Sequence, residues 1–452
     1  MKHAQPTPPA LSFEQAPPIS VPFRFFLTAP LFGAAAGLLL LWQPAAVLAS
    51  RWTPASLALV HLLGPGFMLQ IMCGALLQML PVVVGANVWQ PRRVTALTHA
   101  GLTLGTLLLV LGFLSGSAWL FQVATPLLGA ALGGFAIVVL VALLRTPAEG
   151  PTILVIRLAV VGLLVAVALG ATLGASFGWQ IALPPIDWVD LHAAWALVGW
   201  GLLLVIGVAL LVVPMFQLTP PYPARAARAV PIAIFALVSV WSLGRVVPTA
   251  ARTVIACAVA TLAIAFAAAT LWLQSRRRRK IVEATLLFWR LSMIALAVAG
   301  AAFIVFAVTG RIASSPTAPY VLGVLTFVGV FGGVISGMLY RIVPFLSWLH
   351  LQKFALAGLA VPNARRFLGE RPMRVQLYVH ALALALLLAA AVVPAAAYAG
   401  GAALAISFVV LERNILRASL TFMRTKRDLE AKLPTAKPEP GPGVASRASY
   451  GS

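Results

Sequence analysis

The chain has 452 residues, of which 61% are hydrophobic and only 9% are charged. Soluble domains carry roughly a quarter charged residues, so this composition excludes a string of soluble domains and indicates an integral membrane protein. Lys and Arg number 32 against 10 Asp and Glu, which gives a net charge of +22. These basic residues lie beside the ends of apolar runs, so we expect them to contact anionic membrane lipids and not nucleic acid.

Residues 1–22 are rich in Pro and lack the basic start and the small-residue cleavage site of a signal peptide, so we expect a short cytoplasmic tail. Residues 23–424 are expected to form one membrane domain of twelve helices, because a transmembrane helix takes about 20 residues. The expected spans are 26–48, 56–84, 94–114, 117–143, 152–175, 189–217, 229–247, 250–274, 283–309, 319–346, 375–397 and 399–422.

The longest loop between expected spans, 347–374, contains the stretch SWLHLQKFALAGLA, which is typical of an amphipathic helix on the inner membrane surface. Residues 425–452 are charged and then rich in Pro, Gly and Ser, so they are expected to be a disordered cytoplasmic tail. Cys73 and Cys257 both fall within expected spans, and we therefore expect neither a disulfide nor a CxxC-type metal site.

The basic residues cluster in alternate loops. With both termini in the cytoplasm, 28 of the 32 Lys and Arg lie on the inner side. The exceptions are Arg51, Arg245, Arg252 and Arg311. This bias predicts a multi-pass protein of a bacterial-type cytoplasmic (inner) membrane with both termini inside.

A pattern of Gly, seven residues, Gly, six residues and Pro occurs three times, beginning at Gly66, Gly199 and Gly329. The distance between successive copies is the length of four membrane helices with their loops, so it predicts three related units at about 26–143, 152–274 and 283–422. We expect helix packing at the glycines and a bend or end of the helix at each proline. The motif residues are Gly66, Gly74, Pro81, Gly199, Gly207, Pro214, Gly329, Gly337 and Pro344.

Ionisable side chains inside a membrane mark function by default. We expect no Asp, Glu or Lys in the middle of a span, while Arg290 is close enough to the inner surface to reach the headgroups. A proton pump needs a chain of titratable groups, and none is expected here.

Two histidines occupy nearly equivalent depths in the first two repeats. His61 precedes the motif of the first repeat and His192 precedes that of the second at almost the same distance. At about 100° per residue, Met68 and Met72 fall near one line with His61. Imidazole and thioether together suit Cu(I) or haem iron. The alternatives are a local hydrogen bond for each histidine and plain packing for the methionines.

Two acidic residues, Asp187 and Asp190, precede His192 in an expected outer loop. A carboxylate commonly holds the ring of a ligating histidine through its second nitrogen. We therefore expect these aspartates to orient His192, or else to attract a cation.

Three four-helix units with a histidine near the outer end of a second helix resemble the haem–copper oxidase subunit I superfamily. The stretch QMLPVVVGANVWQPRR is similar to that family's P-x3-G-A followed by P-R, with one residue fewer in the gap. The matching residues are Pro81, Gly85, Ala86, Pro91 and Arg92. The resemblance implies an all-α polytopic fold of twelve transmembrane helices in three pseudo-threefold arcs. It also implies a haem-ligand role for His61 and a copper-ligand role for His192.

The chain departs from that family at most other metal ligands. His192 is followed by AAWA in place of the family's glutamate and tyrosine. The seventh helix has no adjacent histidine pair, and the tenth has no His-x-His. The resemblance therefore implies an oxidase-like protein of the NnrS type, a group associated with nitric oxide stress, without oxygen-reductase or proton-pumping activity.

Three functions remain open from the sequence. The first is an oxidase-like protein that binds haem, or copper, through His61 and His192, in a redox or nitric oxide response or in metal handling, with a respiratory or redox partner protein. The second is a metal-free assembly or structural subunit of a respiratory complex. The third is a small-solute permease. We find no nucleophile–base pair or phosphate-binding loop, so no enzyme activity is expected.

Overall fold

The computed structural model describes residues 17–182 and 186–433, and this part of the chain is helical without strands. Twelve helices are long and apolar enough to cross a membrane, which confirms the predicted all-α polytopic class. The spans are α1 (Ser20–Trp42), α3 to α4 (Pro54–Val82), α5 (Pro91–Ser115), α6 (Ala118–Arg145), α7 (Pro151–Trp179), α8 to α9 (Asp187–Gln217), α10 (Ala224–Trp241), α11 (Thr249–Ser275), α12 (Ala284–Val308), α14 to α15 (Thr317–Leu356), α16 (Glu370–Ala389) and α17 (Ala396–Glu430).

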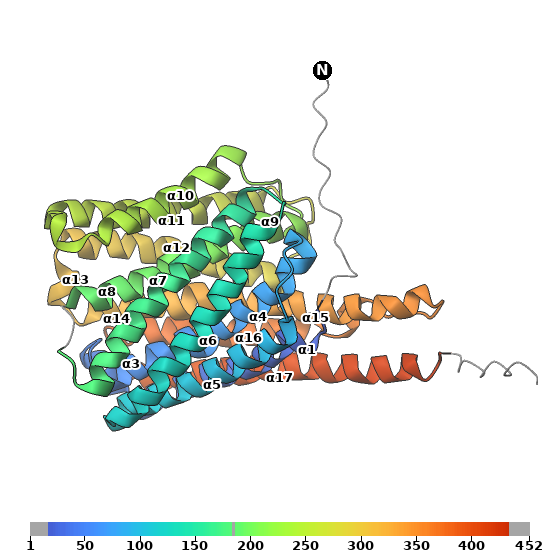
Figure 1. Cartoon of the computed structure of the whole chain (residues 1–452), viewed down its shortest axis with the longest axis horizontal. Coiled ribbons are helices and arrows are strands. Elements are labelled where there is room, and N and C mark those ends of the chain that lie inside the picture. Colours follow the sequence, from blue (N-terminus) through green and yellow to red (C-terminus); the bar gives the residue numbers. More distant parts are fainter. Residues whose placement is uncertain (1–16, 183–185, 434–452) are drawn as a thin grey trace, which may run out of the picture.

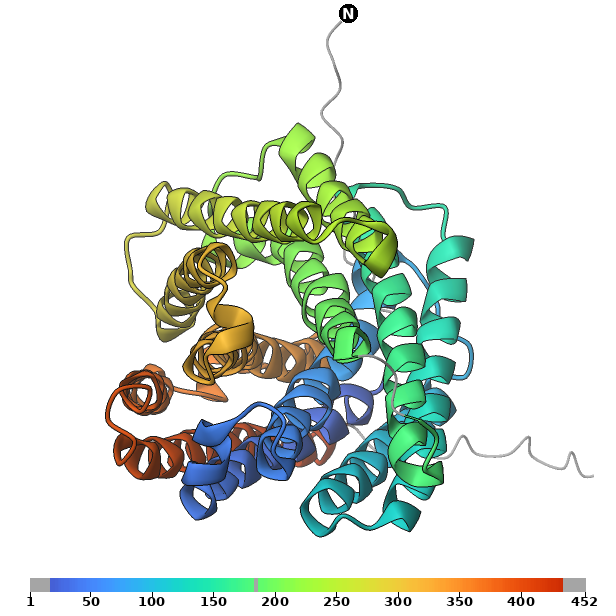
Figure 2. The same cartoon turned by 90° about the vertical axis from the view of Figure 1, so that its left-hand side faces the viewer.

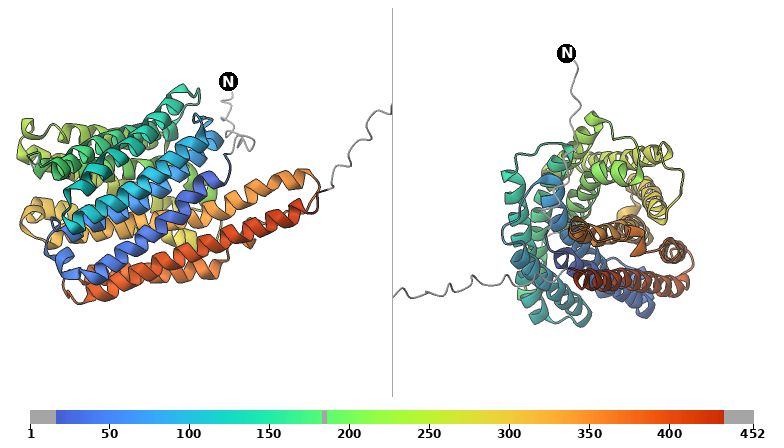
Figure 3. Two further views of the ribbon diagram at one scale, coloured as in Figure 1. Left: turned by 60° about the horizontal axis from the view of Figure 1, so that its bottom comes forward. Right: turned by 90° about the vertical axis from the view of Figure 1, so that its right-hand side faces the viewer.

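Short helices lie between or within these spans. They are α2 (Pro44–Ala49), η3 (Leu80–Val84), η5 (Gly244–Val246), α13 (Arg311–Ser314) and η7 (Ala364–Arg366). The start of α1 and the end of α17 lie at the same end of the bundle, where α15 and α17 extend beyond the other helices (Figures 1 and 3).

The second, sixth and tenth spans, which carry the Gly–Gly–Pro motifs, are the most buried. In their most apolar stretches 78, 67 and 72% of the residues are buried, against 56% or less in every other span. Viewed along the bundle, parts of these blue, green and orange helices meet near the middle (Figure 2). These three spans are therefore the inner helices. Their arrangement in pseudo-threefold arcs stays a prediction.

Each inner span contains a π-helical segment around its first motif glycine, in which the backbone bonds run from residue i to i+5, and η3 at the end of the second span is a further π-helical segment. The segments around the glycines are η2 (Leu62–Leu69), η4 (Trp195–Leu202) and η6 (Val324–Gly332). Each segment ends three residues after the first glycine of its motif, so the three segments share one register with the sequence repeat. The repeat is therefore present in the backbone geometry as well as in the sequence.

The motif glycines bring each inner span against the helix that precedes it in its own repeat. In all three repeats a glycine of one helix leaves no room for a Cβ against the other helix, so the backbones approach closely. The contacts join Gly66 to Phe32, Gly74 to Phe25, Gly199 to Gly162, Gly207 to Val155 and Ile156, Gly329 to Ala295, and Gly337 to Phe288.

The three motif prolines have different effects. The helices end three residues after Pro81 and Pro214, as expected, but α15 continues past Pro344 to Leu356. Residues 347–356 are thus part of the tenth span and do not form a separate surface helix. The extension persists because its apolar side chains, including Leu349 and Phe354, are buried.

The last helix also corrects the sequence-based prediction. It continues to Glu430, so residues 425–430 of the expected disordered tail are helical, while residues 434–452 lie outside the described part. Glu412 lies within this span, contrary to the expectation that its middle holds no acidic residue. Two residues further on, and on another side of the helix, Asn414 packs against α15 and donates a 2.9 Å hydrogen bond to the Tyr340 hydroxyl, whereas Glu412 Oε2 has no hydrogen-bond partner among the described residues.

The glycine contacts make a stability prediction. Gly162→Val should lower the free energy of unfolding by about 2–3 kcal/mol, because a side chain there would collide with the backbone carbonyl of Gly199 and force the helices apart. Denaturant unfolding of the purified protein measures the loss. Gly133→Val is the matched control, since a Cβ at Gly133 meets nothing within 4 Å. Equal losses in the two variants would contradict a packing role for Gly162.

Candidate functional site

His61 is the last residue of α3 (Pro54–His61) and directly precedes the π-helical segment η2. Its Nδ1 lies 2.7 Å from the backbone carbonyl oxygen of Leu57, one turn earlier. Because a carbonyl can only accept, Nδ1 carries the proton, and in the neutral ring Nε2 presents a lone pair. The local helix thus fixes the tautomer of His61.

His192 lies in α8 (Ile186–Ala194) and is fixed by the neighbouring helix α7. Its Nδ1 donates to the carbonyl oxygen of Ala166 at 2.9 Å. One turn further along α7, Gly170 leaves room for the ring, since a Cβ there would lie 2.8 Å from Cε1 of His192. The Nε2 lone pair is again left for a ligand, so both histidines have the same tautomer.

A stripe of small residues on α7 positions His192. Gly162, Ala166 and Gly170 recur every four residues and therefore lie on one face of the helix. The first contacts the backbone of η4, and the other two contact His192. The sequence-based prediction did not include these residues. Their small-xxx-small spacing is the signal that identifies them.

The structure brings the two predicted histidines together from different spans. Their ring centroids are 6.5 Å apart, and their planes are inclined by only 11°. This separation is too large for direct ring contact. A metal–nitrogen bond is about 2 Å long, so rings at this separation are close enough for both to reach one ion.

The predicted methionines do not join the histidines in one cavity. Met72 lines a cavity between the inner helices further along the span, but neither His61 nor Met68 lines it. Met68 is buried within η2. The expectation that Met68 and Met72 line the space below His61 is therefore corrected, because the π-helical segment separates the histidine from the cavity.

The two aspartates hold arginines and do not hold Nδ1 of His192. Asp190 forms a 2.7 Å ion pair with Arg51, and Asp187 forms a 3.5 Å ion pair with Arg252. A backbone carbonyl takes the orienting role that was expected of the aspartates. These ion pairs instead connect α8 to the start of α3 and to α11 at this end of the bundle.

The site offers two imidazole side chains and little room beside them. Within residues 17–182 and 186–433, no three His, Cys, Asp or Glu side chains converge on a possible metal position, so the two imidazoles would be the protein ligands. A haem needs a flat slot between its axial ligands. Phe113 packs 5.2 Å from the ring of His61, and Gly170 abuts the ring of His192.

The cavity lined by Met72 is the second notable feature. It has a volume of about 150 Å³ and lies between α4 (Gln70–Met79), α9 (Leu203–Gln217) and α15 (Gly333–Leu356), with Trp289 of α12 beside it. A smaller space of about 20 Å³ adjoins it and shares four lining residues. Those residues are Val212, Phe216, Trp289 and Met338.

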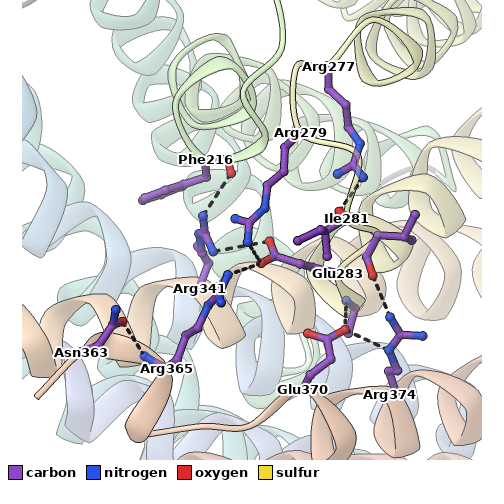
Figure 4. Close-up of polar contacts among 12 residues, drawn as sticks. Phe216, Arg277, Arg279, Ile281, Glu283, Arg341, Asn363, Arg365, Glu370 and Arg374 are labelled. Carbon is purple, nitrogen blue, oxygen red and sulfur yellow. Dashed lines mark hydrogen bonds and ion pairs between the residues drawn. The ribbon is translucent and has the colours of Figure 1, made fainter.

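Arginines surround Glu283 where the smaller space begins (Figure 4). The Glu283 carboxylate lies 3.0 Å from Arg279, 3.7 Å from Arg341 and 3.6 Å from Arg365. Arg341 also donates to the carbonyl oxygen of Phe216 at 3.1 Å, and so satisfies a backbone acceptor in the last turn of the sixth span. One carboxylate thus connects the sixth, ninth and tenth spans.

Comparison with known proteins adds no family to this description. No model of a known protein family matches the chain, and no curated protein is significantly similar to it.

The Glu283 cluster makes a second stability prediction. Glu283→Gln should lower the free energy of unfolding by about 2 kcal/mol, because it leaves partly buried arginines without a counter-charge. Glu430→Gln, which removes the exposed ion pair with Lys426, should cost less than about 1 kcal/mol. Denaturant unfolding of both variants tests the difference. A loss at Glu283 no larger than that at Glu430 would show that the cluster does not stabilise the helix ends.

Proposed function

We propose that this polytopic membrane protein binds a copper ion through His61 and His192, as an oxidase-like protein of metal handling or of a redox or nitric oxide response. One observation carries the proposal: two rings from different spans lie 6.5 Å apart, each with Nδ1 held by a backbone carbonyl. In that arrangement the Nε2 atom of each neutral ring has a lone pair that can bind a metal ion. Haem, the other expected cofactor, is less well supported because Phe113 and Gly170 pack directly against the two rings.

The ligand set favours Cu(I) over other common metals. Imidazole is a good ligand for copper, zinc and iron, but structural zinc sites are almost always closed by four ligands. Two nitrogen ligands are enough for Cu(I). A bound copper ion would supply one-electron chemistry or would itself be the cargo. The chain's own contribution is to fix the tautomers of both rings through Leu57 and Ala166 and to restrict their rotation.

The lack of the other oxidase ligands in the sequence argues against a binuclear reductase. We therefore place the protein among oxidase-like chains that bind metal without reducing oxygen or pumping protons. A respiratory or redox protein is the proposed partner. A metal-free assembly subunit and a small-solute permease are the alternatives that the binding experiment separates from this proposal.

Copper binding makes a direct prediction. The purified protein should bind one equivalent of Cu(I) in competition with a chromogenic chelator, and His61→Ala or His192→Ala should weaken binding at least tenfold because each removes one of two ligands. His99→Ala is the control, since its Nε2 bonds to Thr28 at 2.9 Å. Unchanged Cu(I) affinity in both site variants would refute the site. A Soret band lost in His61→Ala would identify haem as the ligand instead.

We also propose that both termini face the cytoplasm of a bacterial-type inner membrane. Twelve spans put the termini on one side, and the Lys and Arg bias favours the inside. Green fluorescent protein fused after Ser452 should fluoresce, and alkaline phosphatase fused there should be inactive. An active phosphatase fused after Ser452 would show that the C-terminus lies outside and that the predicted topology is inverted. A phosphatase fusion after Gly244, in η5 between α10 and α11 and outside by the predicted topology, is the positive control.

A further inference from the structure

The central cavity is formed by equivalent positions of the three repeats. Five positions in each inner helix line it, and they correspond to one another when the three sequence motifs are aligned on their glycines. The sets are Ile71, Leu204 and Val334; Met72, Val205 and Ile335; Ala75, Val208 and Met338; Met79, Val212 and Ile342; and Val82, Met215 and Phe345. The cavity therefore runs lengthwise between the three helices.

Its dimensions indicate an elongated occupant. The first and last of these positions are about three helical turns apart, which corresponds to roughly 16 Å along a helix. A volume of about 150 Å³ spread over that length leaves a narrow channel. Because nearly all of the lining side chains are apolar, a single hydrocarbon chain fits its shape and chemistry.

One lining side chain conflicts with an apolar cavity. Gln78 is only 5% exposed, and neither Oε1 nor Nε2 has a hydrogen-bond partner. An unpaired buried amide costs about 1–3 kcal/mol, so a ligand that pairs with it would gain that energy. The amide therefore indicates where a polar head group would lie.

Arginine side chains lie at the level of Gln78 along the inner helices. The alignment of the repeats relates Gln78 to Leu211 and to Arg341, which lines the smaller adjoining space together with Arg277 and Arg279. Glu283 is the one carboxylate among the residues lining that space. The three arginines thus exceed the acidic charge, and an oxyanion is the complementary head group.

We propose that the central cavity binds one acyl chain with an oxyanion head group, the head beside Gln78 and Arg341 and the chain extending toward η2, η4 and η6. A free fatty acid and an anionic single-chain phospholipid share this chemistry. The inference does not depend on the copper proposal, because the histidines do not line this cavity.

Binding of radiolabelled decanoate to the purified full chain in a non-ionic detergent tests the inference. Decanoate should bind saturably, and 1-decanol should compete at least tenfold less well because it lacks the charge that the arginines pair with. If lysophosphatidylglycerol competes more strongly than unlabelled decanoate, the natural ligand is a phospholipid. If decanoate competes more strongly, the natural ligand is a free fatty acid. Competition by decanol equal to that by unlabelled decanoate would overturn the proposal.

Variants locate the two halves of the ligand. Gln78→Glu should weaken decanoate binding at least tenfold and leave decanol binding intact, because the new carboxylate repels the head group. Gln78→Leu removes an unpartnered amide, so it should fold and still weaken decanoate binding. Ala75→Phe should block the chain, since Ala75 lines the cavity. Gln352→Glu, outside the cavity, is the matched control. Decanoate binding unchanged in the folded Gln78 variants would refute the assigned site.

Discussion

Close backbone approach between each inner helix and its predecessor is the constraint on which the rest of this structure depends. Lipid supplies no hydrophobic force between helices, so packing must come from shape, and glycine provides it here. The contact of Gly162 with Gly199 fixes α7 against η4. On the same face of α7, the carbonyl of Ala166 bonds to His192, and Gly170 leaves room for its ring. The geometry of the candidate site thus follows from helix packing.

The two ends of the inner helices are specialised differently. At the outer end by the predicted topology, the two histidine rings lie 6.5 Å apart with their tautomers fixed, and the nearby carboxylates form ion pairs with Arg51 and Arg252. At the other end, arginines outnumber carboxylates, and an unpaired amide points to a missing partner. Repeated helices enclose both regions, yet each region depends on residues that differ among the repeats.

Sequence reasoning predicted what depends on composition and period. It yielded twelve spans, the repeat spacing and the pairing of His61 with His192 as candidates, because hydropathy and matched depth are local properties. It missed features set by tertiary contacts. Nothing local distinguishes Pro344 from Pro81, and the buried side chains beyond Pro344 decide that α15 continues. The partner of His192 is likewise a carbonyl of another helix, which no side-chain pattern encodes.

The π-helical segments η2, η4 and η6 set the rotational orientation of the inner helices that follow them. A π-helical turn contains about one residue more than an α-helical turn. Because each residue rotates an α-helix by about 100°, one extra residue changes the direction of all the side chains that follow it. Removing one residue from η2 would therefore turn Gln78, Met79 and Val82 away from the central axis while leaving His61 in place. Equivalent segments in the second and third repeats keep all three helices in step. These segments thus couple the direction in which the histidines point to the direction in which the cavity wall points, although the two regions share no lining residue.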